Sequence, residues 1–303
     1  MHGPNITTSA ARDSRVALVT CAAMNGLDPD DELTVAPLKE RGVQVEAAVW
    51  DDPDVDWAAY DLAVVRSTWD YYPRREEFLA WARRVPRLAN PAAVLEWNTD
   101  KRYLRGLAAA GVATAPTTWV EPGAAWTPAD AGEVVVKPAV SGGGNDTGRY
   151  DLADAEERRL AVAHARRLTG DGRLVMVQPY LAAVDEHGET ALIFFAGHFS
   201  HAIRKGPLLR RGEGPTRALF AEEQISARKP SDDELRVATR TLGAIPFAKP
   251  LLYARVDLIH DADAAPRVLE LELTEPSLFF NHADGSAARF AEEVRAVASR
   301  APA

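Results

Sequence analysis

Two short apolar stretches near the C-terminus contain a regular pattern of acidic residues: YARVDLI (residues 253–259) and LELELTEP (residues 269–276). In the first stretch Asp257 lies between apolar neighbours, and in the second Glu270 and Glu272 alternate with leucines. Because successive side chains of a strand point to opposite faces, the two glutamates are expected to share one face. The opposite face is then left to Leu269, Leu271 and Leu273.

Carboxylates gathered on one face of an apolar strand pair repel one another unless a cation lies among them. Mg²⁺ prefers oxygen ligands and completes its shell with water and phosphate oxygens. The pattern therefore predicts a magnesium site formed by Asp257, Glu270 and Glu272. An amphipathic strand with a solvated acidic face would show the same pattern, so the choice depends on the other motifs of the chain.

The bulk composition is that of a globular protein, with 303 residues of which 47% are hydrophobic and 26% are charged. No apolar run approaches the ~20 residues that span a bilayer, so no membrane partner is expected. The formal charge of −9 argues against nucleic acid as the main partner but allows a nucleotide bound by a few lysines. The single cysteine, Cys21, excludes an internal disulfide and favours a structural role. These features favour the cytoplasm.

The first third of the chain alternates between strand and helix patterns. Residues 1–14 are polar and are expected to form a disordered lead. Short β-branched runs follow at 15–20, 43–49 and 61–65, with helical patterns at 30–41 and 74–84. This alternation predicts a parallel α/β unit over residues 15–97.

The middle third predicts a second lobe over residues 98–181. Helical patterns lie at 98–110 and 153–168, and strand patterns lie at 117–120, 133–138 and 174–177. Between the last two strands lies the glycine-rich turn SGGGNDTG, residues 141–148.

The last third predicts a third lobe over residues 182–303, richer in antiparallel strands. Two strands within 191–205 reverse at Ala196 and Gly197, and Ser231 and Glu234 form a capping box at the start of a helix over 231–242. A strand pair at 252–259 and 268–274 and a helix at 286–298 complete the chain. The expected fold class is therefore α/β in the first lobe and α+β in the other two.

Two lysines stand in places where they suit phosphate binding. Lys137 ends the apolar strand EVVVKP directly before the glycine-rich turn, whose backbone amides can approach phosphate oxygens closely. Lys101 is expected in the first turn of a helix, where a cation is unfavourable for the helix dipole and so suggests another purpose. Each lysine taken alone is more often a solvated surface charge.

The segment that follows strand 174–177 suits the recognition of a nucleoside. Its backbone groups can pair with an adenine edge, and Asp185 or Glu189 can accept from ribose hydroxyls. A connecting loop with a buried tyrosine remains the alternative. The hinge residues are Gln178, Pro179, Tyr180 and Leu181.

The order of these motifs resembles the ATP-grasp superfamily on its glutathione-synthetase-like side, and the resemblance covers about residues 98–277. It implies an ATP-grasp fold preceded by an α/β pre-ATP-grasp domain, with ATP and Mg²⁺ as cofactors. It implies nucleotide contacts from Lys101, Lys137 and the hinge, and metal ligation by Asp257, Glu270 and Glu272. The family often has Asn where this chain has Glu272. Within the glycine-rich turn, the phosphate-binding residues are expected to be Ser141, Gly142, Gly143 and Gly144.

Residues for the reaction and the substrate are expected in three places. Arg204 resembles the superfamily's basic residue at the transferring phosphate, and it alternates with Lys205, whose side chain points to the opposite face. Both are basic candidates for catalysis, against the alternative of an exposed basic strand end. The loop after strand 61–65 lies where open α/β sheets bind ligands, although a helix-capping turn explains it equally well. The substrate candidates are Arg66, Ser67, Thr68 and Asp70 in that loop, and Glu275 and Ser277 beyond the metal strand.

Several stretches, among them VVRSTWDYYPRREEFLAW and LELTEPSLFF, resemble a bacterial subgroup that includes an O-ureido-D-serine cyclo-ligase of cycloserine biosynthesis. The resemblance implies phosphorylation of a small amino-acid-like carboxylate to an acyl phosphate, followed by attack of an amine. An intermolecular amino-acid ligase and a non-catalytic ATP-binding module remain as alternatives. The sequence leaves a monomer and a homodimer equally open.

Overall fold

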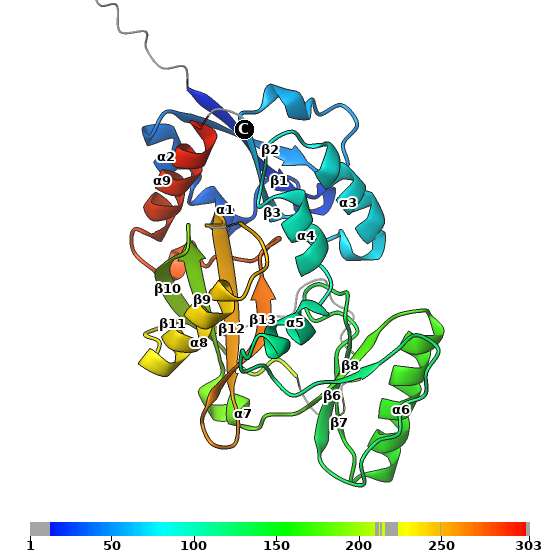
Figure 1. Cartoon of the computed structure of the whole chain (residues 1–303). Helices are drawn as coiled ribbons and strands as arrows, with labels where there is room; N and C mark the ends of the chain where they lie inside the picture. Colours follow the sequence, from blue (N-terminus) through cyan, green and yellow to red (C-terminus); the bar gives the residue numbers. More distant parts are fainter. Residues whose placement is uncertain (1–12, 210–211, 213, 216–223, 249, 301–303) are drawn as a thin grey trace, which may run out of the picture.

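The computed structural model describes residues 13–209, 212, 214–215, 224–248 and 250–300, and the chain there forms three sheets (Figure 1). The first sheet has the strand order β2–β1–β3–β4 and is parallel throughout. Its strands are β1 (Ser14–Thr20), β2 (Val43–Val49), β3 (Leu62–Ser67) and β4 (Leu88–Ala89). The predicted parallel α/β unit is thus confirmed. Residues 1–12 of the expected lead lie outside the described residues, and Ser14 already belongs to β1.

The helix predicted over residues 30–41 is wrong, because two short helices stand in its place: α1 (Pro29–Glu32) and α2 (Val35–Glu40). Pro37 has no backbone N–H to continue a single helix across this region. Thr34 instead turns back and donates its hydroxyl to the carbonyl of Asp31 at 2.7 Å. The break leaves Asp31 buried. The second predicted helix appears as α3 (Arg75–Arg84).

The second sheet has the order β5–β8–β6–β7 and is antiparallel. Its strands are β5 (Thr118–Val120), β6 (Glu133–Pro138), β7 (Gly148–Asp151) and β8 (Val175–Pro179). The helix α6 (Ala155–Gly170) packs on this sheet through Ala161, Ala165 and Leu168. The sequence reading missed β7, which begins at the last residue of the glycine-rich turn.

The helix predicted over residues 98–110 begins only at Tyr103, as α5 (Tyr103–Ala109). Another helix, α4 (Ala92–Asn98), ends where the prediction began, and Lys101 lies in the turn between the two rather than in a first helical turn. The backbone N–H of Lys101 donates to the carbonyl of Ala139 at 2.9 Å. This contact ties the turn to the end of β6 and directs Lys101 toward the glycine-rich turn.

The third sheet has the order β11–β10–β9–β12–β13. The hairpin of β9 (Glu189–Phe195) and β10 (His198–Lys205) reverses at Ala196 and Gly197 as predicted, and Ser231 and Glu234 form the predicted capping box of α8 (Asp232–Gly243). The predicted closing helix is α9 (Ser286–Ala298). The remaining elements of this part are α7 (Ala183–His187), β11 (Ile225–Arg228), β12 (Tyr253–His260) and β13 (Pro266–Glu272).

The two acidic stretches pair as the antiparallel strands β12 and β13, with Asp257 opposite Glu270. The register shifts between Asp257 and Leu258, so that Leu269 forms a bulge. Leu271 and Leu273 belong to the buried core, although Leu271 also borders the cavity. Leu269 lies outside that core, lines the cavity with the glutamates and packs beside Tyr180 and Leu181. The predicted placement of all three leucines on the opposite face is therefore wrong at Leu269, because the bulge interrupts the period of two.

The C-terminal helix α9 returns to the first sheet, where it lies beside α2 (Figure 1). Phe290 and Val294 of α9 share one apolar core with Val16 and Leu18 of β1. The division of the chain into three parts at residues 97 and 181 stays a prediction. Helix α9 belongs to the third predicted part but packs against the sheet of the first part. The described residues also include short 3₁₀ turns at Ala22–Met24, Trp57–Ala59, Tyr72–Arg74 and Phe280–His282.

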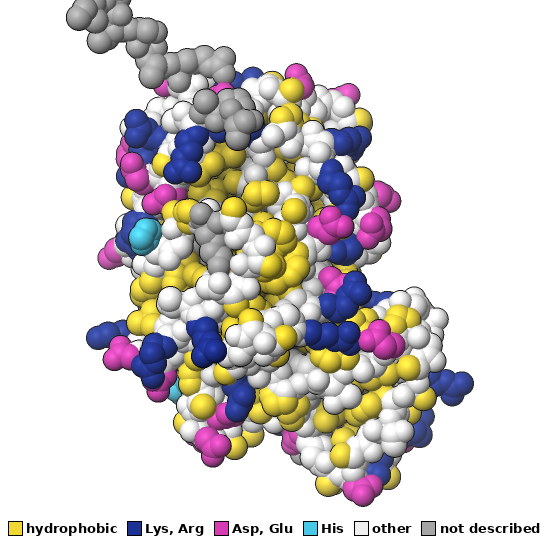
Figure 2. Space-filling view, viewed as in Figure 1, with side chains coloured by type: hydrophobic (Ala, Val, Ile, Leu, Met, Phe, Trp, Pro, Cys, Tyr) yellow, Lys and Arg dark blue, Asp and Glu magenta, His cyan; other side chains and the backbone are white. Residues whose placement is uncertain are grey.

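The surface in Figure 2 has charged groups of both signs interspersed around hydrophobic side chains in the middle of the face. No helix of the described part is long and apolar enough to cross a membrane.

Candidate active site

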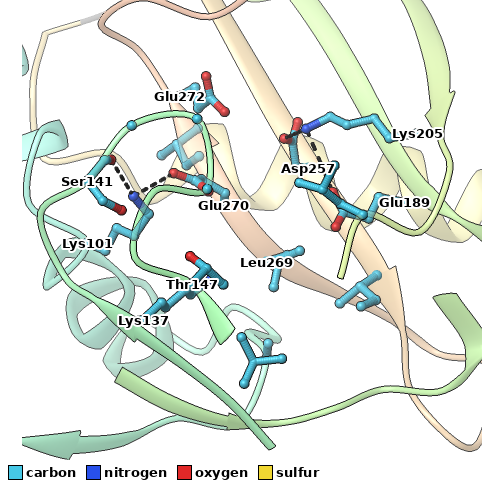
Figure 3. Close-up of a pocket in the computed structure, with 18 of the residues that line it drawn as sticks. Lys101, Lys137, Ser141, Thr147, Glu189, Lys205, Asp257, Leu269, Glu270 and Glu272 are labelled. Carbon is cyan, nitrogen blue, oxygen red and sulfur yellow. Dashed lines mark hydrogen bonds and ion pairs between the residues drawn. The ribbon is translucent and has the colours of Figure 1, made fainter. Parts of the chain in front are cut away.

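A cavity of about 360 Å³ lies between the second and third sheets and reaches the loop after β3. Predicted residues from the second and third parts of the chain line it, and Figure 3 labels ten of the lining side chains. Of the predicted site residues, those that line the cavity are Lys101, Lys137, Ser141, Gly142, Gly143, Gly144, Gln178, Pro179, Tyr180, Leu181, Glu189, Lys205, Asp257, Glu270, Glu272, Glu275 and Ser277.

Asp257 lies at the centre of a buried charge cluster on β12. Lys205 Nζ donates to its Oδ2 at 2.5 Å, and Arg255 Nε donates to its Oδ1 at 2.8 Å. Burial alone would raise the pKa of Asp257, but the two cations outweigh it and lower this pKa to about 2. The carboxylate is therefore ionised throughout the neutral range.

Lys101 connects the acidic strand to the glycine-rich turn. Its Nζ lies 3.0 Å from Glu270 Oε1 and donates to the carbonyl of Ser141 at 3.1 Å (Figure 3). Burial lowers the pKa of nearby Lys137, while the charge of Glu270 partly offsets this effect. Two lysines from different elements thus face the same end of the cavity, where they can neutralise a polyanion.

Glu272 is the carboxylate whose charge is least compensated among the three predicted metal ligands. Arg255 Nη2 donates to its Oε1. Burial, together with the nearby charges of Asp257 and Glu270, nevertheless raises the pKa of Glu272 to about 7. A cation among these three groups would relieve that repulsion, so the oxygen donors fit a hard divalent ion such as Mg²⁺.

The opposite end of the cavity is apolar. Leu269 at the bulge and Leu181 at the hinge pack in one cluster with buried residues Ala115, Val184 and Ile259. The backbone N–H of Tyr180 is already paired with the carbonyl of Glu133 at 2.8 Å, and Gln178 donates its amide to Thr117. This end therefore offers flat apolar surfaces suited to an aromatic base.

The last two residues of β13 and the chain that follows them, residues 271–277 together, are fixed by side chains along their length. We call residues 271–277 the exit segment. Its carbonyls accept hydrogen bonds of 2.7–3.1 Å from Asn98 at Leu271, Asn90 at Leu273, Tyr253 at Thr274, Trp69 at Glu275, Arg66 at Pro276 and Arg255 at Ser277. Four of the six donors, those other than Tyr253 and Arg255, come from the first hundred residues, so the N-terminal part of the chain holds this wall of the cavity in place.

These contacts explain why Arg66 does not line the cavity. Its Nε pairs with buried Asp31 at 2.8 Å, and its Nη2 donates to Pro276. Burial raises the pKa of Asp31 to about 6 despite the attraction of Arg66. Arg66 is thus placed as a support beneath the exit segment, not as a group facing the cavity.

The other polar residues of that loop also lie away from the cavity. Ser67 donates to Thr20 at 3.0 Å, and Thr68 is buried. Asp70 accepts from the indole of Trp50 at 2.9 Å and pairs with Arg74. Their short side chains serve the packing of the first sheet. This agrees with the alternative that the sequence left open for this loop, a structural turn.

Two further predicted residues point elsewhere. Asp185 accepts from Tyr180 Oη at 2.5 Å and is not among the cavity residues. Arg204 donates to the carbonyls of His187 and Glu186 at the end of α7 at 2.8 and 2.9 Å. Since strand side chains alternate, Lys205 faces the cavity and Arg204 faces away from it.

His187, Glu234 and His260 form a small cluster behind α7, with ligand atoms within 4.8 Å of one another. Arg228 donates to His187 Nε2 at 2.5 Å, and Glu234 Oε1 accepts from Thr190. The lone pair on His187 Nε2 therefore already accepts a hydrogen bond from the guanidinium of Arg228.

The glycine-rich turn is fixed at its base. Asp146 accepts from Arg167 at 2.6 Å and from Arg173 at 2.7 Å, and Arg173 also donates to the carbonyl of Val140. The turn closes on itself through Asn145 N–H to Gly142. Its glycines therefore project into the cavity from a base held by two arginines.

Sequence reasoning missed several residues of the cavity. Arg255 lies two residues before Asp257 on β12, so the period of two would have placed it on the same face. The aromatic wall of the cavity consists of Trp69, Tyr71, Tyr72 and Phe279. Trp69 lies in the loop where the sequence placed ligand binding, but the other three gave no such signal, because they come from separate loops.

Solved structures of low sequence identity share this fold. D-alanine–D-alanine ligase from Bacillus anthracis matches with a TM-score of 0.63 at 13% identity, over 94% of this chain and 97% of that one. ATP-grasp ligase PsnB, complexed with a minimal precursor, matches with a TM-score of 0.60 at 17% identity, over 94% and 99% of the two chains. The fold, with its lysines and acidic strand pair, is that of an ATP-grasp ligase.

A relative of higher sequence identity indicates the family to which the chain belongs within this class. Cycloserine biosynthesis protein DcsG from Streptomyces lavendulae is 39% identical over 293 residues, which are 91% of this chain and 96% of the relative. The crystal structure of D-cycloserine synthetase DcsG matches with a TM-score of 0.82 at 36% identity, over 94% of this chain and all of that one. Residues 16–90 match the model of the D-cycloserine synthetase DcsG N-terminal domain. The chain belongs to the DcsG family.

Proposed function

We propose that this ligase uses Mg²⁺ and ATP to activate the carboxylate of O-ureido-D-serine as an acyl phosphate and closes the ring of D-cycloserine. The observation that supports this most is the arrangement of the cavity. An apolar end, two lysines with a glycine-rich turn, and a carboxylate cluster with Arg255 follow one another along it. The name of the relative at 39% identity supports the choice of product.

The nucleotide is proposed to lie along this cavity. Its adenine would occupy the apolar end beside Leu181 and Leu269, and Glu189, rather than Asp185, would accept from the ribose. The phosphates would then reach Lys101 and Lys137 under the glycine-rich turn.

Mg²⁺ is proposed to bind among Asp257, Glu270 and Glu272. Bound there, the ion would neutralise charge on the phosphate oxygens. Lys205 and Arg255, which pair with Asp257 in its absence, would then be available to anionic groups of the substrate.

A free carboxylate is a poor acylating agent, because attack on it would have to expel oxide. Transfer of the γ-phosphoryl group to a carboxylate oxygen gives an acyl phosphate and ADP. Attack by the side-chain N–O nitrogen on the carbonyl carbon then forms the C–N bond, breaks the bond to phosphate and releases a proton. That nitrogen bears a carbamoyl group; water hydrolyses its bond to the nitrogen, the group leaves as CO₂ and ammonia, and D-cycloserine remains. The residues of the chain orient these groups, and no side chain acts as nucleophile. Cys21 is buried in the first sheet.

Phosphate release with Mg²⁺ and ATP tests this proposal, with each enantiomer of O-ureidoserine offered alone and the product identified by mass spectrometry. The D-enantiomer alone should stimulate release and yield D-cycloserine. Release that requires a second amine would instead identify an intermolecular ligase. If no carboxylate stimulates release, the proposal is wrong.

A further inference from the structure

Glu275 differs from the other cavity carboxylates in the described part of the chain. Asp257, Glu270 and Glu272 are each paired with a lysine or arginine. Glu275 also lines the cavity, yet it forms no ion pair with any described residue. Buried carboxylates are normally paired, so an unpaired one in a binding cavity indicates a cationic ligand.

The position of Glu275 is fixed before any ligand arrives. Its carbonyl accepts from the indole of Trp69 at 3.1 Å, and the next carbonyl, of Pro276, accepts from buried Arg66. Its carboxyl group hydrogen-bonds to the buried side chain of Tyr71. A ligand that pairs with Glu275 therefore loses little free energy to ordering of the protein.

The surroundings of Glu275 favour a cation. Burial, followed by the charge of Glu272, raises the pKa of Glu275 to about 8. Lys101, whose charge partly offsets this effect, is already paired with Glu270. Trp69 and Tyr72 also line the cavity. Aromatic faces attract ammonium groups, and a new positive charge there would relieve the repulsion between the two glutamates.

We infer that Glu275, held by Tyr71, binds the α-ammonium group of the amino-acid substrate. This inference rests on the proposed function, because it concerns the orientation of the same substrate. Arg255, whose guanidinium reaches from Asp257 to the carbonyl of Ser277, lies where it can meet the carboxylate end. One amino acid would thus be held by its ammonium at Glu275 and by its carboxylate near Arg255. The enzyme would accept amino acids and discriminate against acids that lack the amine.

The test compares O-ureido-D-serine with 3-(ureidooxy)propanoic acid, which lacks only the α-amino group. Equilibrium binding of each acid to the enzyme loaded with Mg²⁺ and ADP is measured by calorimetry, and ADP formation is measured with ATP. The wild-type enzyme should prefer the amino acid by roughly 100-fold, as expected for a buried charge pair. Glu275→Gln should remove most of this preference by weakening the amino acid alone. Tyr71→Phe should reduce the preference by about tenfold, as expected for one hydrogen bond to a charged group.

The matched control is Glu76→Gln, an exposed carboxylate on α3 that should leave both acids unaffected. The inference is overturned if Glu275→Gln weakens both acids equally, if it weakens neither, or if the wild-type enzyme shows no preference in binding. Thermal unfolding of each variant separates a loss of fold from a loss of binding. If the wild-type enzyme forms no ADP with either acid, the proposed function fails, and the binding preference still decides the role of Glu275.

Discussion

The two walls of the cavity are held in opposite ways. The exit segment accepts side-chain hydrogen bonds at Leu271, Leu273 and every residue from Thr274 to Ser277, mostly from distant parts of the chain. The glycine-rich turn is held at its base by Asp146 and at its entrance by Lys101, which donates to Ser141. One wall is therefore rigid, and the other is attached at two places.

This difference agrees with the chemistry that each wall is proposed to serve. The exit segment continues from the metal-site carboxylates, whose positions must match the reacting groups closely. The glycine-rich turn must approach phosphates that enter and leave in each cycle, so attachment at its ends suffices. Changes to the rigid wall should therefore lower kcat or stability, and changes to the turn should raise the KM for ATP.

The largest effect is expected from Asp257→Asn, on β12 opposite Glu270, beside the rigid wall. The change removes one carboxylate charge between Lys205 and Arg255 and one proposed metal ligand. We expect kcat to fall by roughly 1,000-fold or more, as for the loss of several kcal/mol of transition-state stabilisation. Steady-state ADP formation over a range of Mg²⁺ concentrations measures this. A loss of less than about tenfold would contradict the metal role of Asp257.

A large loss of stability is expected from Arg66→Met, beneath the exit segment. The change leaves buried Asp31 without its cation and Pro276 without its donor. Breaking one side of a buried ion pair costs about 3–5 kcal/mol. Urea unfolding should show this loss in the free energy of unfolding.

The double variant Asp31→Asn/Arg66→Met provides the control, because it removes both charges. It should recover part of the lost stability. If the double variant is no more stable than Arg66→Met, the ion pair is not what Arg66 contributes. A loss of substrate binding at unchanged stability would instead restore the role that the sequence predicted for Arg66.

The contrast between the walls also explains which residues the sequence could predict. Asp257, Glu270 and Glu272 lie on one strand pair, and Lys137 lies beside the glycine-rich turn, so local patterns bring them to notice. Arg66 was misplaced because its role depends on Asp31, whose burial follows from a helix break that periodicity did not show.

The aromatic wall, apart from Trp69, lay beyond sequence reasoning for a related reason. Tyr71 and Phe279 are separated by about two hundred residues and line one cavity because the exit segment packs against the loop after β3. The bulge at Leu269 was likewise invisible, since an extra residue in one strand depends on its pairing with the other. By contrast, the parallel first sheet and the capping box of α8 depend on local spacing and were predicted correctly.

A smaller effect is expected from Asp146→Ala, at the base of the glycine-rich turn. The variant frees Arg167 and Arg173 and loosens the turn without touching the exit segment. We expect the KM for ATP to rise by about tenfold, with kcat changed less, because the cost is that of ordering the turn on the nucleotide. Arg159→Ala removes an exposed partner of Glu156 on the same helix α6 and should leave both parameters unchanged. If Asp146→Ala lowers kcat and leaves KM unchanged, the turn belongs with the rigid wall.

The smallest effect is expected from Arg204→Ala, beside the cavity residue Lys205. Arg204 caps the carbonyls of Glu186 and His187, so its loss should cost about 1 kcal/mol of stability and less than about threefold in kcat. Lys205→Ala, one residue further along β10, removes the partner of Asp257 and should lower kcat by roughly 100-fold or more. Steady-state kinetics of both variants, with Tm as the check on folding, show which of Arg204 and Lys205 contributes to the reaction. A large loss of kcat in Arg204→Ala at unchanged Tm would mean that this side chain leaves α7 and enters the cavity when substrates bind. The alternation of faces seen along β10 would then describe only the ligand-free state.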